Sequence, residues 1–339
     1  MHDLIVVGAG PAGLATALYA ARAGLDTVVL EARTSPIDKA CGEGLMPGAV
    51  AALRDLGIPL DGHLLRGIRY TDGRRRVEAE FRTGPGLGMR RTALQAALQT
   101  AAAARGVAVL ERRAGQIEQD AHRVTVAGTT GRYLVAADGL HSPIRRQLGL
   151  DGVPPSHLPR WGLRRHFAVT PWTDFVEVHW ARDREAYVTP VGDHLVGVAV
   201  LSAHRGAFDE HLSAFPVLAQ HLAGTAVTGV RGAGPLRQDA TARVAGRVLL
   251  VGDAAGYVDA LTGEGIDIAL RCARVLVPCL LRGQPAGYER QWCRASRRSR
   301  WLTSGLVWAR RQPRLGMSIV PVAAHAPRLF AAAVQQVAR

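Results

Sequence analysis

The sequence contains a single lysine, Lys39, although its formal net charge at neutral pH is +14. Nearly all of its positive charge is therefore arginine, and the arginines are spread along the whole chain. A nucleic-acid-binding protein would instead gather basic residues on one face. We expect no nucleic-acid partner.

Cysteine pairs and long apolar runs are also missing. The four cysteines, Cys41, Cys272, Cys279 and Cys293, form neither a C-x-x-C pair nor a cysteine–histidine spacing typical of metal sites. We expect no metal and no disulfide framework, and reduced thiols fit a cytoplasmic protein. The first predicted strand begins at residue 3 or 4, which leaves no length for a signal peptide. No run of 18 apolar residues predicts a membrane span.

The most informative motif lies in the first 31 residues. An apolar run over residues 4–7 predicts a buried strand. Gly8, Gly10 and Gly13 follow with G-x-G-x-x-G spacing, which allows a tight turn, close approach to a diphosphate, and close helix–strand packing. The following helix directs its N-terminal N–H groups at that diphosphate. A second strand ends in Glu31, which is placed to bind a ribose hydroxyl. This unit predicts a dinucleotide site.

Two later apolar strands end in similar motifs. Residues 133–137 lead into Asp138 and Gly139, and residues 244–251 lead into Gly252 and Asp253. In an open parallel sheet, the crevice at the carboxyl ends of the strands is where ligands bind. An aspartate at such a strand end is also typical of a helix N-cap.

Other segments predict the surrounding elements. Residues 64–81 alternate around a Thr-Asp-Gly turn, as in a hairpin. Further elements are expected as strands at 162–169, 175–180, 186–189 and 195–201, helices at 204–222 and 265–281, and a crossover at 153–155. The four strands favour an antiparallel sheet flanking a ligand. The tail from residue 288 is expected to be helical, with breaks at Pro313, Pro321 and Pro327.

The order of the three nucleotide motifs resembles that of the glutathione-reductase-type flavoproteins of the p-hydroxybenzoate hydroxylase and geranylgeranyl reductase superfamily, over residues 1–285. The resemblance implies an α/β fold, α+β overall, in which a Rossmann FAD-binding domain is interleaved with an antiparallel β-sheet substrate domain. A helical C-terminal tail follows. The implied division is 1–62, 84–153 and 240–285 for the FAD-binding domain, 63–83 and 154–239 for the substrate domain, and 286–339 for the C-terminal helical region.

The resemblance also implies how FAD is held. Glu31 and Arg33 would take the adenosine ribose side, and Arg91 the ribityl or pyrophosphate region. Asp138 would support the pyrophosphate, and Asp253 would hydrogen-bond the ribityl chain. The candidate cofactor-binding residues are Gly8, Gly10, Pro11, Ala12, Gly13, Glu31, Ala32, Arg33, Cys41, Gly42, Arg91, Asp138, Gly139, Gly252, Asp253, Gly263, Glu264, Gly265 and Ile266.

The segment from Thr262 to Gly265 carries the most mechanistic information. Two glycines at a helix start allow close backbone approach, and the helix dipole there favours negative charge. In the related families this segment lies against the isoalloxazine ring, where the dipole would ease reduction. The hydroxylases usually carry a proline just before the Thr-Gly pair, whereas residues 259–261 here are Asp-Ala-Leu.

Four residues are candidates for catalysis. Cys41 resembles the cysteine in the Cys-Gly-Gly segment of geranylgeranyl reductases, and Glu43 would be an acid or base near the ring. Tyr187 and Thr189 lie where the reductases carry Tyr-x-Trp-x-Phe-Pro and the halogenases Trp-x-Trp-x-Ile-Pro. Neither tryptophan is present, which argues against halogenation and also against a prenyl reductase. The alternatives are an inert buried thiol, a solvated carboxylate and ordinary strand residues.

The first functional hypothesis is a monooxygenase that hydroxylates or epoxidises a small apolar molecule through a flavin C4a-hydroperoxide. The alternative is reduction of a C=C bond in a prenyl or polyketide-like substrate, as in geranylgeranyl reductases. A flavin-free binding module is a third hypothesis, against which the complete motif set argues. No second G-x-G-x-x-G follows a strand, so we expect NAD(P)H as a transient reductant, or a partner reductase.

The C-terminal tail places Trp292, Trp301 and Trp308 among many arginines. Such a segment would bind an acidic carrier protein or an anionic membrane surface, which would make a cytoplasmic protein peripheral to the membrane. A solvated helical face with its tryptophans packed inward gives the same pattern.

Overall fold

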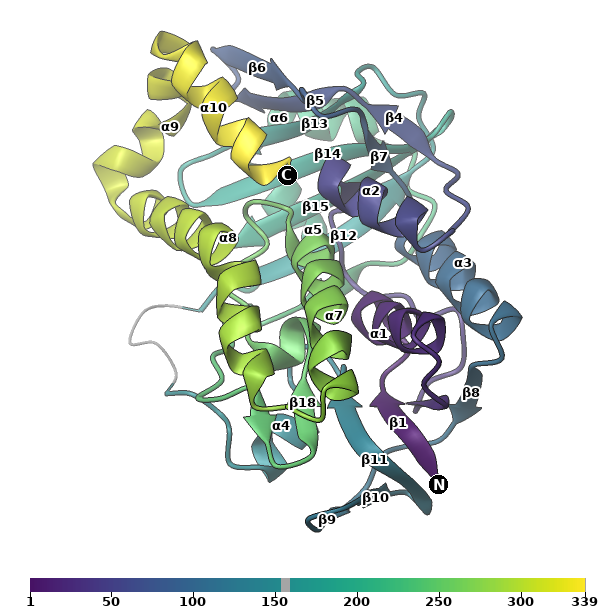
Figure 1. Ribbon diagram of the computed structural model, residues 1–339. Helices are drawn as coiled ribbons and strands as arrows, with labels where there is room; N and C mark the ends of the chain where they lie inside the picture. Colours follow the sequence, from purple (N-terminus) through teal and green to yellow (C-terminus); the bar gives the residue numbers. More distant parts are fainter. Residues whose placement is uncertain (154–158, 339) are drawn as a thin grey trace.

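The computed structural model describes residues 1–153 and 159–338, in which helices surround two large sheets (Figure 1). The first sheet has eight strands, and its main path is β17–β18–β11–β1–β2–β8, with β10 and β9 joined to β11. Its strands are β1 (His2–Val7), β2 (Thr27–Glu31), β8 (Ala108–Glu111), β9 (Ile117–Gln119), β10 (Val124–Val126), β11 (Thr129–Ala136), β17 (Val244–Ala245) and β18 (Val248–Leu250).

The parallel part of this sheet gathers the nucleotide motifs. β18, β11, β1, β2 and β8 run parallel, so their carboxyl ends meet at one edge. Val7 lies in register with Leu30 and Ala136, and Ala136 with Leu250. These strands are continuous apolar runs because both sheet faces are covered. The three predicted motifs therefore share one edge.

The second sheet has seven strands in the order β16–β12–β15–β14–β13–β5–β6 and is antiparallel except between β13 and β5. Its strands are β5 (Gly67–Thr71), β6 (Arg76–Glu80), β12 (Trp161–Phe167), β13 (Phe175–Trp180), β14 (Arg184–Gly192), β15 (Leu195–Ser202) and β16 (Arg231–Ala233). A small third sheet contains β3 (Gly44–Leu45), β7 (Gly86–Gly88) and β4 (His63–Leu65). The fold is the predicted flavoprotein architecture, while the predicted domain boundaries stay a prediction.

The helices cover the first sheet and then cross to the second (Figure 1). α1 packs against α3 and α7, α8 packs against α7, and α9 and α10 reach β6 of the second sheet. The bounds are α1 (Pro11–Arg22), α2 (Pro47–Asp55), α3 (Arg91–Ala104), α4 (Pro143–Gln147), α5 (Phe208–Leu212), α6 (Pro216–Leu222), η1 (Gly252–Ala255), α7 (Gly265–Leu281), α8 (Gly287–Arg311), α9 (Pro313–His325) and α10 (Pro327–Val337).

Three predicted elements differ from the structure. The helix at 204–222 is two helices, because Pro216 is accommodated only at the start of α6. The strand at 244–251 is a β17–β18 hairpin, because Gly246 turns the chain with φ 61°. The break at Pro321 is wrong, since α9 continues through it, whereas breaks occur at Pro313 and Pro327. The crossover at 153–155 falls mostly outside the described residues.

Within residues 1–153 and 159–338, no single helix has the length and apolar character to cross a membrane. Arg314–His325 and Pro327–Val337 meet that criterion only as a pair, and they are bent by 105° relative to each other.

Candidate cofactor and substrate site

The glycine turn after β1 is shaped for a diphosphate. Gly8 has φ 108°, and a Cβ there would lie 2.4 Å from the carbonyl oxygen of Ala137. A Cβ at Gly13 would lie 1.9 Å from the carbonyl oxygen of Gly8, so α1 packs closely on the turn. Around Gly10 only the Arg91 guanidinium comes within 4 Å of such a Cβ. α1 starts at Pro11 without a side-chain cap, which leaves its first N–H groups for a ligand.

Glu31 ends β2 and is buried beside this turn. Its Oε2 accepts the N–H of Ala9 at 2.8 Å, and its Oε1 accepts the N–H of Arg33 at 3.0 Å. Glu31 therefore holds the glycine turn in place. Each carboxylate oxygen has a second lone pair, so ribose binding by Glu31 stays a prediction.

Lys39 and Arg91 form a cationic cluster over the sheet edge. The Lys39 ammonium lies 2.9 Å from where a Cβ of Gly139 would be, and the Arg91 guanidinium lies 3.6 Å from where a Cβ of Gly10 would be. Burial lowers the pKa of Lys39, and the charges of Arg33 and Arg91 lower it further. Among the described residues, the buried Nη1 of Arg91 has no hydrogen-bond partner. The half-buried Lys39 ammonium and the buried Arg91 guanidinium, which has an unpaired donor, favour an anion here, and the diphosphate of FAD fits this cradle.

The two aspartates predicted to hold the cofactor lie at the same edge. Asp138 Oδ2 accepts the N–H of Ile144 at 3.1 Å, as a turn aspartate would. Its buried Oδ1 has no partner within the described part of the chain and is free to accept from a ligand. Burial raises the pKa of both Asp138 and Asp253, and the charges of Lys39 and Arg91 oppose this at Asp253. Their contacts with FAD stay predictions.

The start of α7 is fixed by α8. Glu264 precedes the helix, is 2% exposed, and accepts the Ser299 hydroxyl at 2.8 Å through Oε1. The Thr262 and Thr303 hydroxyls are 2.8 Å apart. Gly263, which lies between Thr262 and Glu264 in the chain, has φ 70°. Two residues of α8 thus hold the predicted ring-facing segment in one conformation.

Cys41 and Glu43 lie in a tight turn before β3. The N–H of Glu43 donates to Cys41 Sγ at 3.3 Å, and Glu43 has φ 60°. Burial raises the pKa of the Cys41 thiol, and the Glu43 charge raises it further. Cys41 is therefore a protonated thiol at neutral pH, not a reactive thiolate.

Glu43 is 2% exposed, so it is not a solvated loop carboxylate. Its Oε1 accepts the backbone N–H of Arg91 at 2.8 Å, and its Oε2 lies 2.6 Å from His166 Nε2. His166 Nδ1 is 3.0 Å from the Arg164 guanidinium, which has only donors, so Nδ1 accepts and Nε2–H donates to Glu43. Glu43 thus connects β12 to the residue that starts α3.

A cavity of about 550 Å³ lies beside these segments. Tyr187 on β14 borders it and donates its hydroxyl to the Leu261 carbonyl at 2.8 Å. Thr189 is buried next to the Cys41 turn, because its methyl lies 3.8 Å from where a Cβ of Gly44 would be. No charged side chain is among the lining residues, which are Met46, Ile68, Tyr70, Val176, Val178, Tyr187, Leu261, Thr262, Gly263, Trp301, Leu302, Gly305, Leu306, Ala309, Leu315, Ser318, Ile319, Val322, Ala323, Ala326, Leu329, Phe330, Ala333, Val334 and Val337.

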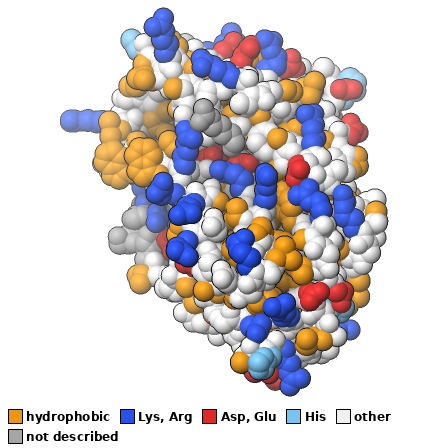
Figure 2. Space-filling model, in the orientation of Figure 1, with side chains coloured by type: hydrophobic (Ala, Val, Ile, Leu, Met, Phe, Trp, Pro, Cys, Tyr) orange, Lys and Arg blue, Asp and Glu red, His pale blue; other side chains and the backbone are white. Residues whose placement is uncertain are grey.

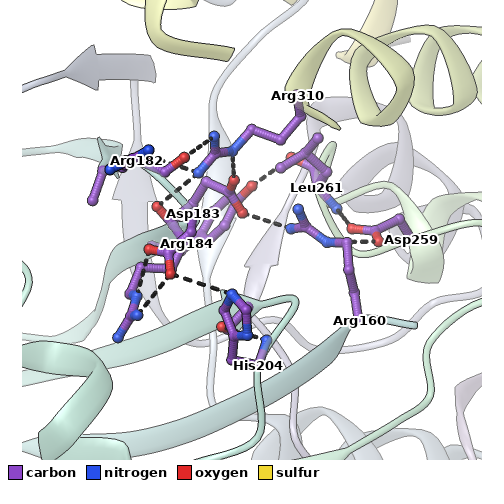
Figure 3. A network of polar contacts seen from close by, with 12 residues as sticks. Arg160, Arg182, Asp183, Arg184, His204, Asp259, Leu261 and Arg310 are labelled. Atoms are coloured by element: carbon purple, nitrogen blue, oxygen red, sulfur yellow. Dashed lines mark hydrogen bonds and ion pairs between the residues drawn. The ribbon is translucent and has the colours of Figure 1, made fainter. Parts of the chain in front are cut away.

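A buried ionic network supports the wall of this cavity (Figure 3). Glu185 is fully buried, and its two oxygens pair with Arg160, at 2.6 Å, and with Arg310 of α8. Arg160 also pairs with Asp259 at 3.1 Å, and Asp259 accepts the Leu261 N–H at 3.1 Å. The network therefore joins β14 and α8 to the loop that leads to the ring-facing segment.

Sequence reasoning missed Lys39, His166 and this ionic network as site residues. One weak signal in the sequence could have indicated Lys39: it is the single lysine of the sequence and lies in the irregular stretch before Cys41. His166 is 123 positions from Glu43, and Glu185 is 125 from Arg310, so no local pattern indicates either pairing.

Comparison with known proteins agrees with this geometry. A family model described as an FAD binding domain matches residues 1–282. The menaquinone reductase of Mycobacterium tuberculosis is 32% identical over 333 residues, which cover 82% of this chain and 76% of that protein. Digeranylgeranylglycerophospholipid reductase 1 of Methanopyrus kandleri is 30% identical over 300 residues, which cover 80% of this chain and 78% of that protein. A flavoprotein/dehydrogenase from Cytophaga hutchinsonii has the same fold, with a TM-score of 0.79, 18% identity and 98% coverage of each chain.

Proposed function

The chain belongs to the family of FAD-dependent oxidoreductases that carry this FAD binding domain, and from that premise we propose that it reduces a C=C bond in the isoprenoid chain of a lipid. The two relatives described above support this, because menaquinone and digeranylgeranylglycerophospholipid both carry isoprenoid chains. Two relatives named as reductases favour reduction over oxygen insertion.

The apolar cavity is the observation that carries the proposal. Its volume of about 550 Å³ lies within the range of small-molecule sites, and the described residues that line it include no charged side chain. Such a wall solvates a hydrocarbon chain and excludes ions. The cavity reaches Leu261, Thr262 and Gly263, the segment predicted to face the flavin ring. A double bond in a chain bound there would lie near the redox centre.

The residues have separate roles in this proposal. FAD supplies hydride transfer when bound. Lys39, Arg91 and the Gly8–Gly13 turn would hold its diphosphate. Reduction of a C=C bond requires a hydride at one carbon and a proton at the other. The Cys41 thiol is the proposed proton source, because burial keeps it protonated and the Glu43 N–H is in place to stabilise the thiolate that remains.

Tyr187 has a positioning role in this proposal. Burial raises the pKa of its hydroxyl well above the ordinary value, and that hydroxyl donates to the Leu261 carbonyl. Tyr187 therefore fixes the cavity wall and does not carry charge. The oxidised cofactor would be re-reduced by transient NAD(P)H or a partner reductase.

Anaerobic turnover tests the proposal. The flavin of the purified holoprotein is reduced chemically without oxygen and mixed with a polyprenyl lipid, and products are analysed by mass spectrometry. A gain of two hydrogens per double bond is expected. A product that forms only after oxygen is admitted, and that carries an atom from ¹⁸O₂, would instead identify a monooxygenase.

A further inference from the structure

The outer face of α8 combines basic and aromatic residues. Arg294, Arg298, Trp301, Gly305 and Trp308 recur at three- and four-residue intervals, so they share one side of the helix. All five are exposed. Trp301 is 75% exposed and Trp308 is 61% exposed, whereas Trp292 packs inward. Two of the three tryptophans of the tail thus face outward.

α9 and α10 extend this apolar surface. Leu315 and Met317 on α9, Val322 further along it, and Leu329 on α10 are all exposed. Figure 2 shows apolar side chains and arginines side by side over the edge where Figure 1 places α8 and α9. We give the name tail face to the following exposed arginines and large apolar residues of α8–α10: Arg294, Arg297, Arg298, Trp301, Trp308, Arg314, Leu315, Met317, Val322, Arg328 and Leu329.

The charge of the tail face has one sign. The sequence from residue 290 to 339 contains many arginines and neither aspartate nor glutamate. Two of these arginines are used internally, since Arg300 pairs with Asp239 and Arg310 with Glu185. Arg294, Arg297, Arg298, Arg314 and Arg328 remain at the surface. A face of this kind fits an anionic partner.

The cavity opens within the tail face. Trp301, Leu315, Val322 and Leu329 line the cavity and are also exposed. An apolar passage therefore leads from the basic surface to the segment at Gly263. Exposed aliphatic residues ringed by arginines and tryptophans match the layers of a bilayer surface, where acyl chains lie beneath anionic headgroups.

We infer that the tail face docks on anionic phospholipid bilayers, and that the substrate enters the cavity directly from the bilayer. The entry route rests on the proposed function, whereas docking rests on the surface alone. Each surface arginine should strengthen binding about fivefold, the equivalent of about 1 kcal/mol near an anionic membrane.

Vesicle sedimentation of the full-length holoprotein tests this inference. The probes are phosphatidylcholine vesicles with and without phosphatidylglycerol, at low and high salt. Arg294→Gln with Arg298→Gln removes two charges, and Trp308→Ser with Met317→Ser removes two apolar groups that do not line the cavity. The matched controls are Arg54→Gln with Arg113→Gln, and Val217→Ser with Val227→Ser, all of which are exposed outside α8–α10.

We expect the protein to bind the anionic vesicles, with an affinity that falls as the salt concentration rises. The arginine pair should lower this affinity about 25-fold and the apolar pair should lower it clearly, whereas neither control pair should change it. Flavin content and circular dichroism should match the wild type in every variant. Equal binding to both vesicle types, or equal effects of test and control pairs, would overturn the inference. So would binding to an acidic carrier protein without binding to vesicles. Vesicle binding without turnover would support docking and contradict only the proposed reaction.

Discussion

Substitution of Glu185 by glutamine should destabilise the protein strongly. Glu185 is fully buried between Arg160 and Arg310. In the variant Arg160 keeps the Asp259 carboxylate. Within the described part of the chain, Arg310 keeps hydrogen bonds to the carbonyls of Ala181, Arg182 and Arg184 but no carboxylate. Removing one partner of a buried ion pair leaves an uncompensated charge, which costs about 3–5 kcal/mol. We expect the free energy of unfolding to fall by about that amount.

The assay is urea unfolding of the holoprotein, with the slope checked for a common two-state transition. The control is Glu78→Gln, which removes a carboxylate paired with Arg69 but 45% exposed, and should cost less than about 1 kcal/mol. The double variant Glu185→Gln with Arg310→Met leaves Arg160 opposite Asp259 and should lose less than the sum of the single losses. A Glu185→Gln loss equal to that of the control would show that the buried ion pairs of Glu185 do not stabilise the fold.

Three further substitutions test other parts of the site. Asp253→Ala should yield protein without FAD, and full flavin absorbance in the purified variant would contradict the assigned role. Cys41→Ser should keep its flavin and lower the rate of C=C reduction by about 10²–10⁴-fold, which is the usual contribution of a positioned proton donor. An unchanged rate would exclude Cys41 as the proton source. Burial raises the pKa of Asp267 to about 6, so the folded state binds its proton more tightly than the unfolded state. The wild type therefore loses stability as the pH rises from about 4 to 6. In urea unfolding, the free energy of unfolding of Asp267→Asn should equal that of the wild type at pH 4 and exceed it by about 3 kcal/mol at pH 8. An equal difference at both pH values would contradict this prediction.

The nucleotide end of the site was predictable because its signals are local. Gly8, Gly10 and Gly13 have the spacing typical of a dinucleotide site. Gly8 follows the strand that an apolar run predicts, Gly10 precedes α1, and Gly13 lies in its first turn. Asp138 and Asp253 follow similar runs, and parallel register then brings them together. The fold class was implied by the family resemblance that these motifs carry.

The support around the reacting region was not predictable in this way. His166 contacts Glu43, and Arg310 contacts Glu185, only because β12 and α8 fold back over distant segments. A histidine within an alternating strand and an arginine within an arginine-rich helix are ordinary residues in sequence. Their roles come from burial and pairing, which tertiary structure alone creates. The exposure of Trp301 and Trp308 likewise depends on which side of α8 packs on α7.

Under the proposed function, this FAD-dependent oxidoreductase reduces a C=C bond of an isoprenoid lipid. The most direct measurement is the mass of the product formed by the reduced holoprotein and a polyprenyl lipid under strict exclusion of oxygen. We expect a product that is heavier than the substrate by two hydrogens per reduced bond. An unchanged lipid without oxygen, together with incorporation of one ¹⁸O atom when ¹⁸O₂ is admitted, would contradict the proposed function.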